Sequence, residues 1–204
     1  MNPPVKTRPD RYSRREQAEA YHASTNAAGR PTLSQRLELA AVARALAAAR
    51  GGASVLDVPC GTGRIDALLR ERFETVVGLD SSEPMLWVYR DGAPGRAGCC
   101  GDIFRLPFDD GAFDWTVCHR YIHHLMSHEE RVRALTSLAR VSRLGVIFYA
   151  WVDTPLARRR SSMRASATPD AVARSIAEAG LTLDRAFRPG GPFSVKRIMV
   201  CARR

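Results

Sequence analysis

The sequence lacks a long apolar segment: no uninterrupted hydrophobic run approaches the roughly 18 residues that a membrane-spanning helix needs. Its first residues, Met-Asn-Pro-Pro-Val-Lys, lack the apolar core of a secretory signal. The five cysteines include no Cys-x-x-Cys pair, which argues against a zinc site and favours reduced thiols. These absences predict a cytoplasmic protein with no transmembrane segment and no metal site.

Lysine is nearly absent, so arginine supplies almost all of the basic charge. The formal net charge of +10 is carried by the flanks: residues 1–30 contribute +3, residues 31–150 contribute zero and residues 151–204 contribute +7. The sharpest basic cluster is Arg158-Arg159-Arg160 together with Arg164. This cluster is either a solvated surface or a contact for an acidic substrate, a membrane surface or nucleic acid.

Apolar runs and helical periodicities alternate along the chain, a pattern typical of a parallel sheet covered by helices. Strands are predicted at about 54–58, 75–79, 97–100, 113–119, 145–151, 181–188 and 194–202. Helices are predicted at about 13–27, 33–50, 63–72, from 82 onward, 128–140 and from 168 to 180. The length suits one domain with a sizeable core.

The most informative segment is Val-Leu-Asp-Val-Pro-Cys-Gly-Thr-Gly-Arg at residues 55–64, where an apolar strand enters a Gly-x-Gly turn before a helical pattern. Such a turn lets a ligand lie against bare backbone at a helix N-terminus. Asp80 ends the next strand, at the place where a nucleoside ribose would lie. A dinucleotide site needs a third glycine near the pyrophosphate, and Asp66 stands there instead. Asp57 suits a ligand that carries an ammonium group and no phosphate.

This segment resembles motif I of the class I S-adenosylmethionine (SAM)-dependent methyltransferases, (D/E)-x-G-x-G-x-G, with Pro59 in place of the first glycine. Three further motifs follow in the order seen in the small-molecule branch of that family: Gly101-Asp102-Ile103, Leu106-Pro107-Phe108 and Phe113-Asp114. The resemblance covers roughly residues 50–151. It implies an α/β fold: a Rossmann-like doubly wound sheet of seven strands, mostly parallel with an antiparallel last strand, with helices on both faces.

The resemblance also implies a single methyltransferase domain over residues 1–204, with SAM as cofactor and S-adenosylhomocysteine (SAH) as product. Residues 1–32 are expected to form an N-terminal arm or lid, and residues 152–168 a basic loop. The expected cofactor contacts are Asp57, Pro59, Gly61, Gly63, Asp80, Ser81, Met85, Asp102, Ile103, His119 and Tyr21. Within this set, Asp80 is expected to bind the ribose hydroxyls, Asp102 the adenine amino group and His119 the methionine part.

Methyl transfer from a sulfonium is an in-line displacement, in which the protein aligns the nucleophile and, for a hydroxyl, supplies a base. Three histidines lie at or just after the end of the strand predicted at 113–119, and they are the candidates for that base: His119, His123 and His124. The alternative is that a member of the pair His123/His124 packs or caps the next helix. With His128, they form pairs four residues apart that would suit a metal in a helix, but no acid converges with them, so no metal is expected.

The expected function is methyl transfer to a small-molecule or lipid-like acceptor through an oxygen or nitrogen nucleophile. The arginine cluster favours an acceptor that is acidic or lipid-linked. One alternative, a nucleic-acid methyltransferase, is suggested by the basic flanks, but the Asp/Asn-Pro-Pro-aromatic motif of exocyclic-amine enzymes is missing after residue 118. The other alternative is a non-catalytic SAM-binding protein, which the departure at Pro59 allows. The sequence leaves the oligomeric state open.

Overall fold

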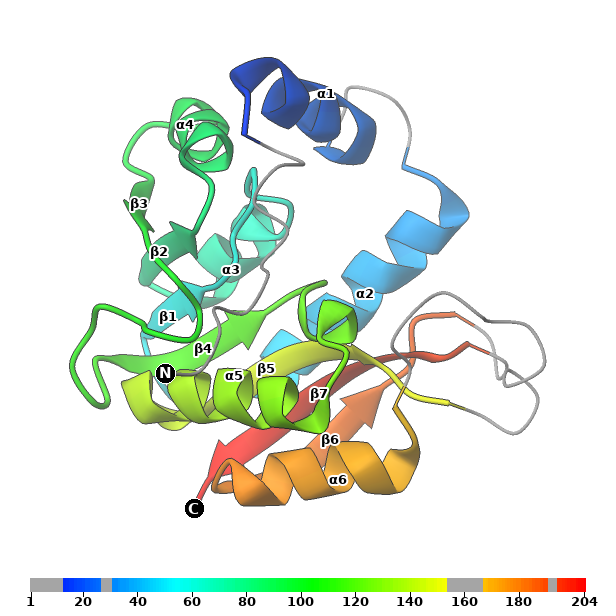
Figure 1. Cartoon of the computed structure of the whole chain (residues 1–204). Coiled ribbons are helices and arrows are strands. Elements are labelled where there is room, and N and C mark those ends of the chain that lie inside the picture. The colour runs from blue at the N-terminus through cyan, green and yellow to red at the C-terminus, as the bar shows by residue number, and fades with distance from the viewer. Residues whose placement is uncertain (1–12, 27–30, 154–166, 191–193) are drawn as a thin grey trace.

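A computed structural model describes residues 13–26, 31–153, 167–190 and 194–204 of the chain (Figure 1). These residues form a seven-stranded sheet in the order β3-β2-β1-β4-β5-β7-β6. Its strands are β1 (Ser54–Asp57), β2 (Thr75–Asp80), β3 (Ala97–Cys100), β4 (Phe113–Cys118), β5 (Ser142–Trp151), β6 (Leu181–Phe187) and β7 (Lys196–Arg203). β7 runs antiparallel to its neighbours β5 and β6, and the other pairs are parallel. The predicted sheet, with its antiparallel last strand, is confirmed.

Helices cover both faces of this sheet (Figure 1). They are α1 (Arg15–Asn26), α2 (Leu33–Ala48), α3 (Asp66–Arg72), α4 (Glu83–Asp91), α5 (His128–Val141) and α6 (Pro169–Glu178), with a short 3₁₀ turn, η2 (Ile122–His124). Side chains alternate along β1, so Val55 is buried in the core under α2 and α3. Leu56 is buried in the opposite core, under α5 and α6. Both faces of the sheet are therefore covered, and a ligand must bind at an edge.

The sheet topology marks one edge for that role. β1 pairs with β2 on one side and with β4 on the other, so the strand order reverses at β1. In open α/β sheets, ligands bind outside the carboxyl ends of the strands at this switch point. The fold thus places the residues after β1, β2 and β4 at the expected ligand site.

Two predicted boundaries are corrected by the structure. The helix predicted from residue 63 begins at Asp66, because Gly61 and Gly63 have φ values of 54° and 86°, outside the helical region. β5 begins at Ser142, three residues earlier than predicted.

The predicted basic loop at 152–168 is described only at its ends, where Val152 pairs with Ala167. Its arginines, including Arg158-Arg159-Arg160 and Arg164, lie outside the described residues. Within the described part of the chain, no helix combines the length and apolar character needed to cross a membrane.

Candidate functional site

The Gly-x-Gly turn after β1 presents bare backbone on one side. An ideal Cβ placed on Gly61 would meet none of the described residues within 4 Å. A Cβ on Gly63 would lie 3.0 Å from the ring of Tyr89 in α4. The two glycines therefore serve different ends: Gly63 allows close packing of the turn on α4, whereas Gly61 leaves the backbone approachable. Pro59, which replaces the first glycine of the motif, follows Val58 through a cis peptide bond.

Asp80, at the end of β2, is tied directly to this turn. Its Oδ2 accepts a 2.8 Å hydrogen bond from the Gly61 N–H, and its Oδ1 accepts one of 2.9 Å from the Ser82 N–H. Burial raises the pKa of Asp80, and the backbone N–H donors partly oppose that rise. Two bonds leave about half of the acceptor capacity of a carboxylate unused, so Asp80 can accept from a ligand while it holds the turn.

Asp57 is the buried acid of the site. It is 1% exposed, and its Oδ1 has no hydrogen-bond partner among the described residues. Burial raises the pKa of Asp57 well above its usual range, and the neighbouring Asp66 and Asp80 raise it further. A buried carboxylate oxygen without a partner is costly, and a ligand with a cationic ammonium group would relieve that cost.

The residues predicted around the nucleoside lie next to Asp80 in the sheet. The Gly101 N–H donates a 3.0 Å bond to the Asp80 carbonyl. Asp102 is exposed, and its Oδ1 accepts from the Phe104 N–H at 2.9 Å. The Ile103 side chain is buried in the main core, so only its backbone remains available for the predicted ring contact. Ser81, between Asp80 and the cap of α4, is exposed.

Tyr21 lies in α1, which packs against α4 beside this edge of the sheet (Figure 1). It contacts the cluster of Ala18, Met85 and Val88, so two predicted cofactor residues from distant segments are brought together. The end of α1 is also joined to the glycine turn, because Arg64 Nη1 donates to the Thr25 carbonyl at 3.2 Å. The N-terminal segment is thereby held over the turn.

His119, directly after β4, faces a buried acid that the sequence analysis missed. Its Nε2 lies 3.4 Å from Oε1 of Glu38, whose side chain in α2 is 4% exposed. Burial lowers the pKa of His119, and Glu38 opposes this shift. Burial raises the pKa of Glu38, but the interaction with the His119 side chain and the charges of Arg120 and Lys196 outweigh burial and bring the pKa down to about 2. The imidazole is therefore held beside a carboxylate that stays ionised.

His123 lies in an aromatic group at the ends of β4 and β5. Its ring stacks on Trp151 with centroids 5.1 Å apart and meets Tyr149 edge-on at 5.2 Å. Trp151 Nε1 in turn donates to the Tyr149 hydroxyl at 2.9 Å. His124 is exposed. The structure thus buries His119 and His123 against the same tyrosine and leaves His124 at the surface.

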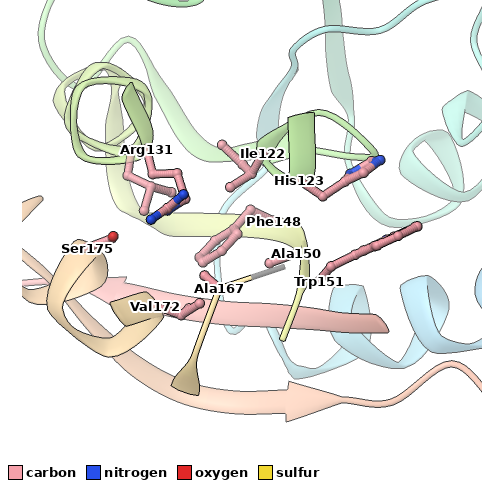
Figure 2. Close-up of a pocket in the computed structure, with 10 residues that line it drawn as sticks. Ile122, His123, Arg131, Phe148, Ala150, Trp151, Ala167, Val172 and Ser175 are labelled. Atoms are coloured by element: carbon pink, nitrogen blue, oxygen red, sulfur yellow. The ribbon is translucent and has the colours of Figure 1, made fainter. Parts of the chain in front are cut away.

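A small pocket opens between η2, α5, β5 and α6 (Figure 2). His123 and Trp151 lie at one side of it and Arg131 and Ser175 at the other (Figure 2). Its volume of about 10 Å³ is enough for about one water molecule. In this conformation it does not admit a methyl acceptor.

The histidine pairs four residues apart do not share a helix. His119 follows a strand, His123 and His124 lie in the 3₁₀ turn, and His128 begins α5. His128 contacts Glu178 and Ser175 at 3.0 and 3.1 Å and so links α5 to α6. In the described part of the chain, no group of three or more His, Cys, Asp or Glu side chains is placed to hold a metal ion.

The structure collects most of the predicted site at one edge and adds residues that sequence reasoning missed. Those additions are Glu38, Arg64 and Tyr149. Glu38 had a detectable signal, because an acid three and four residues before the buried Ala41 and Val42 falls on the apolar face of its helix. Arg64 had none beyond its position after the glycines.

Comparison with known proteins supports the resemblance to methyltransferases. Residues 56–150 match a family described as a methyltransferase domain. The magnesium protoporphyrin IX methyltransferase of Synechocystis PCC 6803, solved with bound SAH, superposes with a TM-score of 0.77 at 18% identity, covering 96% of this chain and 98% of that one. Residues 56–150 are a class I SAM-dependent methyltransferase domain.

The curated relatives of this methyltransferase domain act on different acceptors. A tRNA (carboxymethyluridine(34)-5-O)-methyltransferase, alkbh8 of Xenopus tropicalis, is 32% identical over 108 residues, which is 52% of this chain and 17% of the relative. A malonyl-[acyl-carrier protein] O-methyltransferase of Salmonella typhimurium is 44% identical over 62 residues, which is 30% of this chain and 25% of the relative. The chain therefore spans a quarter or less of these two relatives.

SAM is the cofactor of this family, and the residues at the edge of the sheet fit it. The unpartnered Oδ1 of Asp57 suits the ammonium group, and the open side of Gly61 allows close approach of the ligand to the backbone. The spare acceptor capacity of Asp80 suits a pair of ribose hydroxyls.

The Asp57→Asn variant is expected to stabilise the ligand-free protein while it weakens SAH binding. A raised pKa in the folded state means that ionised Asp57 costs stability at neutral pH, and the neutral amide removes that cost. We expect the free energy of unfolding to rise by about 1 kcal/mol, which corresponds to about 2–4 °C in melting temperature. The gain should shrink as pH falls and the wild-type carboxyl becomes protonated. A variant less stable than wild type at neutral pH would contradict this reading.

Proposed function

We propose that this chain transfers a methyl group from SAM to a small-molecule or lipid-like acceptor, through an oxygen or nitrogen nucleophile. The observation that carries the proposal is the pairing of two different surfaces at one edge of the sheet. Asp80 binds the N–H of Gly61, whose backbone is open to a ligand, and Asp57 has an unpartnered Oδ1 at the end of the neighbouring strand. Beside them, His123 and Trp151 pack on Tyr149 in a surface suited to an apolar acceptor.

In this proposal each acid has one role toward the cofactor. Asp80 accepts from the ribose hydroxyls, Asp57 balances the ammonium group, and Asp102 selects the adenine amino group. Gly61 contributes its bare backbone rather than a side chain. Tyr21 closes the site from above, because α1 is held to the glycine turn through Arg64.

When bound, SAM supplies an activated methyl group and a neutral thioether as leaving group. The protein aligns the acceptor, excludes water and removes a proton from the nucleophile. His119 is suited to removing the proton, because its lowered pKa keeps the imidazole neutral at neutral pH. His123 is the second candidate, because Trp151 and Tyr149 hold its ring in one orientation. His124, at the surface, is the third.

The segment 1–32 acts as an arm over the site in this proposal, and residues 1–204 form one domain. The support comes from α1, whose Tyr21 packs beside Met85 and whose Thr25 carbonyl accepts from Arg64. An arm attached to the glycine turn would exclude water once the cofactor has bound.

A tRNA acceptor is the second candidate function. It is favoured by the match to a tRNA methyltransferase and by the net charge of +10. Against it, residues 31–150, which hold the site, carry no net charge. The excess of basic residues lies in the flanks, and these residues could equally bind a small acidic acceptor.

A melting experiment followed by a turnover assay tests the proposal. At 100 times its dissociation constant, SAH is expected to add about 2.7 kcal/mol of stability, which raises the melting temperature by about 5–10 °C. SAH should then form from SAM with members of a panel of phenols, amines and acyl thioesters, and not with total tRNA. No melting shift would contradict a cofactor site, methylated tRNA would select the second candidate, and binding with no turnover on any acceptor would favour a non-catalytic protein.

A further inference from the structure

A cluster of cations surrounds Glu38 at the same edge of the sheet. Glu38 and these cations come from four segments that are distant in sequence, so only the fold brings them together. Lys196 Nζ lies 3.1 Å from Oε2 of Glu38, Arg64 Nη2 lies 3.6 Å from Oε1, and Arg120 Nε lies 4.0 Å from Oε1. His119 Nε2 is 3.4 Å from the same Oε1. Three permanent cations thus face one carboxylate, leaving two positive charges in excess.

The hydrogen bonds within this cluster are incomplete. The Arg64 side chain is only 9% exposed, yet among the described residues its Nε has no hydrogen-bond partner. Its Nη1 donates to the Thr25 carbonyl. Lys196 donates to Glu38 and, at 3.4 Å, to the Ser34 hydroxyl. A guanidinium has five N–H donors in a fork that matches a carboxylate, so a second anion would satisfy donors that Glu38 does not.

The backbone conformation of Arg120 also indicates a functional role for this residue. Among the described residues, Arg120 alone combines a side chain with a positive φ, at 59°. It directly follows His119, just after the end of β4. A non-glycine residue in this region costs free energy, and such residues cluster at functional sites. Its side chain is 40% exposed, so it reaches from the edge of the cluster toward solvent.

We propose that Arg64, Arg120 and Lys196, arranged around the buried Glu38, form a binding site for a carboxylate. This inference rests on the proposed function, which offers two sources of that group: the methionine part of the cofactor and the methyl acceptor. The charge of the cluster calls for a carboxylate from the acceptor even when the cofactor supplies one. One carboxylate from the cofactor leaves one positive charge in excess, whereas a second carboxylate from the acceptor balances the cluster. The acceptor is therefore an acid with an apolar body that packs on Trp151, which is half-buried and lies opposite Lys196 in the register of β5 and β7.

The test uses the full chain saturated with SAH, and benzoate with benzamide as matched probes. They share an aromatic body, and only benzoate carries the charge. Calorimetry should show benzoate binding at least about tenfold more tightly than benzamide, as a charge-assisted hydrogen bond implies. The preference should disappear in Arg120→Gln and in Lys196→Gln. It should persist in the control Arg185→Gln, which removes one positive charge from an exposed position on β6.

A second arm identifies a cofactor source. If the cluster binds the cofactor carboxylate instead, Arg120→Gln should lower the affinity for SAH about tenfold or more and leave the affinity for decarboxylated SAH unchanged. In that case, benzoate and benzamide should bind the wild type with equal affinity. SAH binding to the wild type with neither preference would overturn the carboxylate site alone. A wild type that does not bind SAH would overturn the proposed function, and this inference with it. Melting temperatures of the variants show that each is folded.

Discussion

The Asp80→Ala variant is expected to bind SAH roughly 10- to 150-fold more weakly than the wild type, a loss of about 1.5–3 kcal/mol. The reason is that Asp80 makes two contributions to one site. Its carboxylate is the acceptor proposed for the ribose hydroxyls, and its Oδ2 fixes the Gly61 N–H at 2.8 Å. Removing the side chain therefore removes a charged acceptor and releases the backbone against which the cofactor lies. Calorimetric titration with SAH measures the effect.

Two variants separate these contributions of Asp80. Asp80→Asn keeps the size and one carbonyl acceptor, so its loss of affinity should fall between those of wild type and alanine. Asp184→Ala is the matched control, because it removes an exposed carboxylate from β6, far along the sheet from β2. We expect wild-type affinity in this control. An Asp80→Ala variant with unchanged SAH affinity would show that the cofactor ribose is held elsewhere.

The order of strands and helices could be predicted because local patterns determine it. β2 and β3 coincide with short apolar runs, and α6 begins where Thr168 and Pro169 predict a helix start. The location of Asp57 and Asp80 at one edge of the sheet also followed from the sequence, because both end adjacent parallel strands, β1 and β2. Periodicity and motif spacing were sufficient for these features.

The surroundings of His119 could not be predicted in the same way. Glu38, which contacts His119, lies 81 residues earlier, and Lys196, which contacts Glu38, lies 77 residues later than His119. Only the packing of α2 against β7 brings Lys196 to Glu38. Helical periodicity places Glu38 on a buried face but does not say which cation meets it. The different roles of Gly61 and Gly63 could not be predicted from the sequence either. Gly61 and Gly63 read alike in a motif, and the contact with Tyr89 alone distinguishes them.

These features share a physical cause. Two of the acids that face the proposed cofactor, Asp80 and Asp102, are held by backbone N–H groups of the turns beside them, and those turns lie within short motifs. The groups that face the proposed acceptor are held by side chains from separate helices and strands. Cofactor recognition is therefore readable from short motifs in this chain, whereas acceptor recognition depends on tertiary packing.

The Gly61→Val variant is expected to lose at least about 100-fold in SAH affinity, equivalent to about 2.7 kcal/mol. A Cβ at this position would lie more than 4 Å from the atoms that the structure describes around it, so the fold leaves open space there. That room is where the proposed cofactor approaches the backbone, and the valine methyl groups would occupy it. The φ of 54° also disfavours a β-branched residue, which lowers stability without requiring any change in binding.

Gly180→Val separates strain from ligand exclusion. Gly180 also has a positive φ, 73°, and an added Cβ there would likewise meet no atom of the described residues within 4 Å, but it lies between α6 and β6. Both variants should melt at lower temperature than the wild type by a similar amount, because both force valine into the left-handed region. The loss of SAH affinity should appear in Gly61→Val and be absent in Gly180→Val. Equal affinities in the two variants would mean that the cofactor does not pass over the turn after β1, and the assignment of Asp57 and Asp80 would then fail as well.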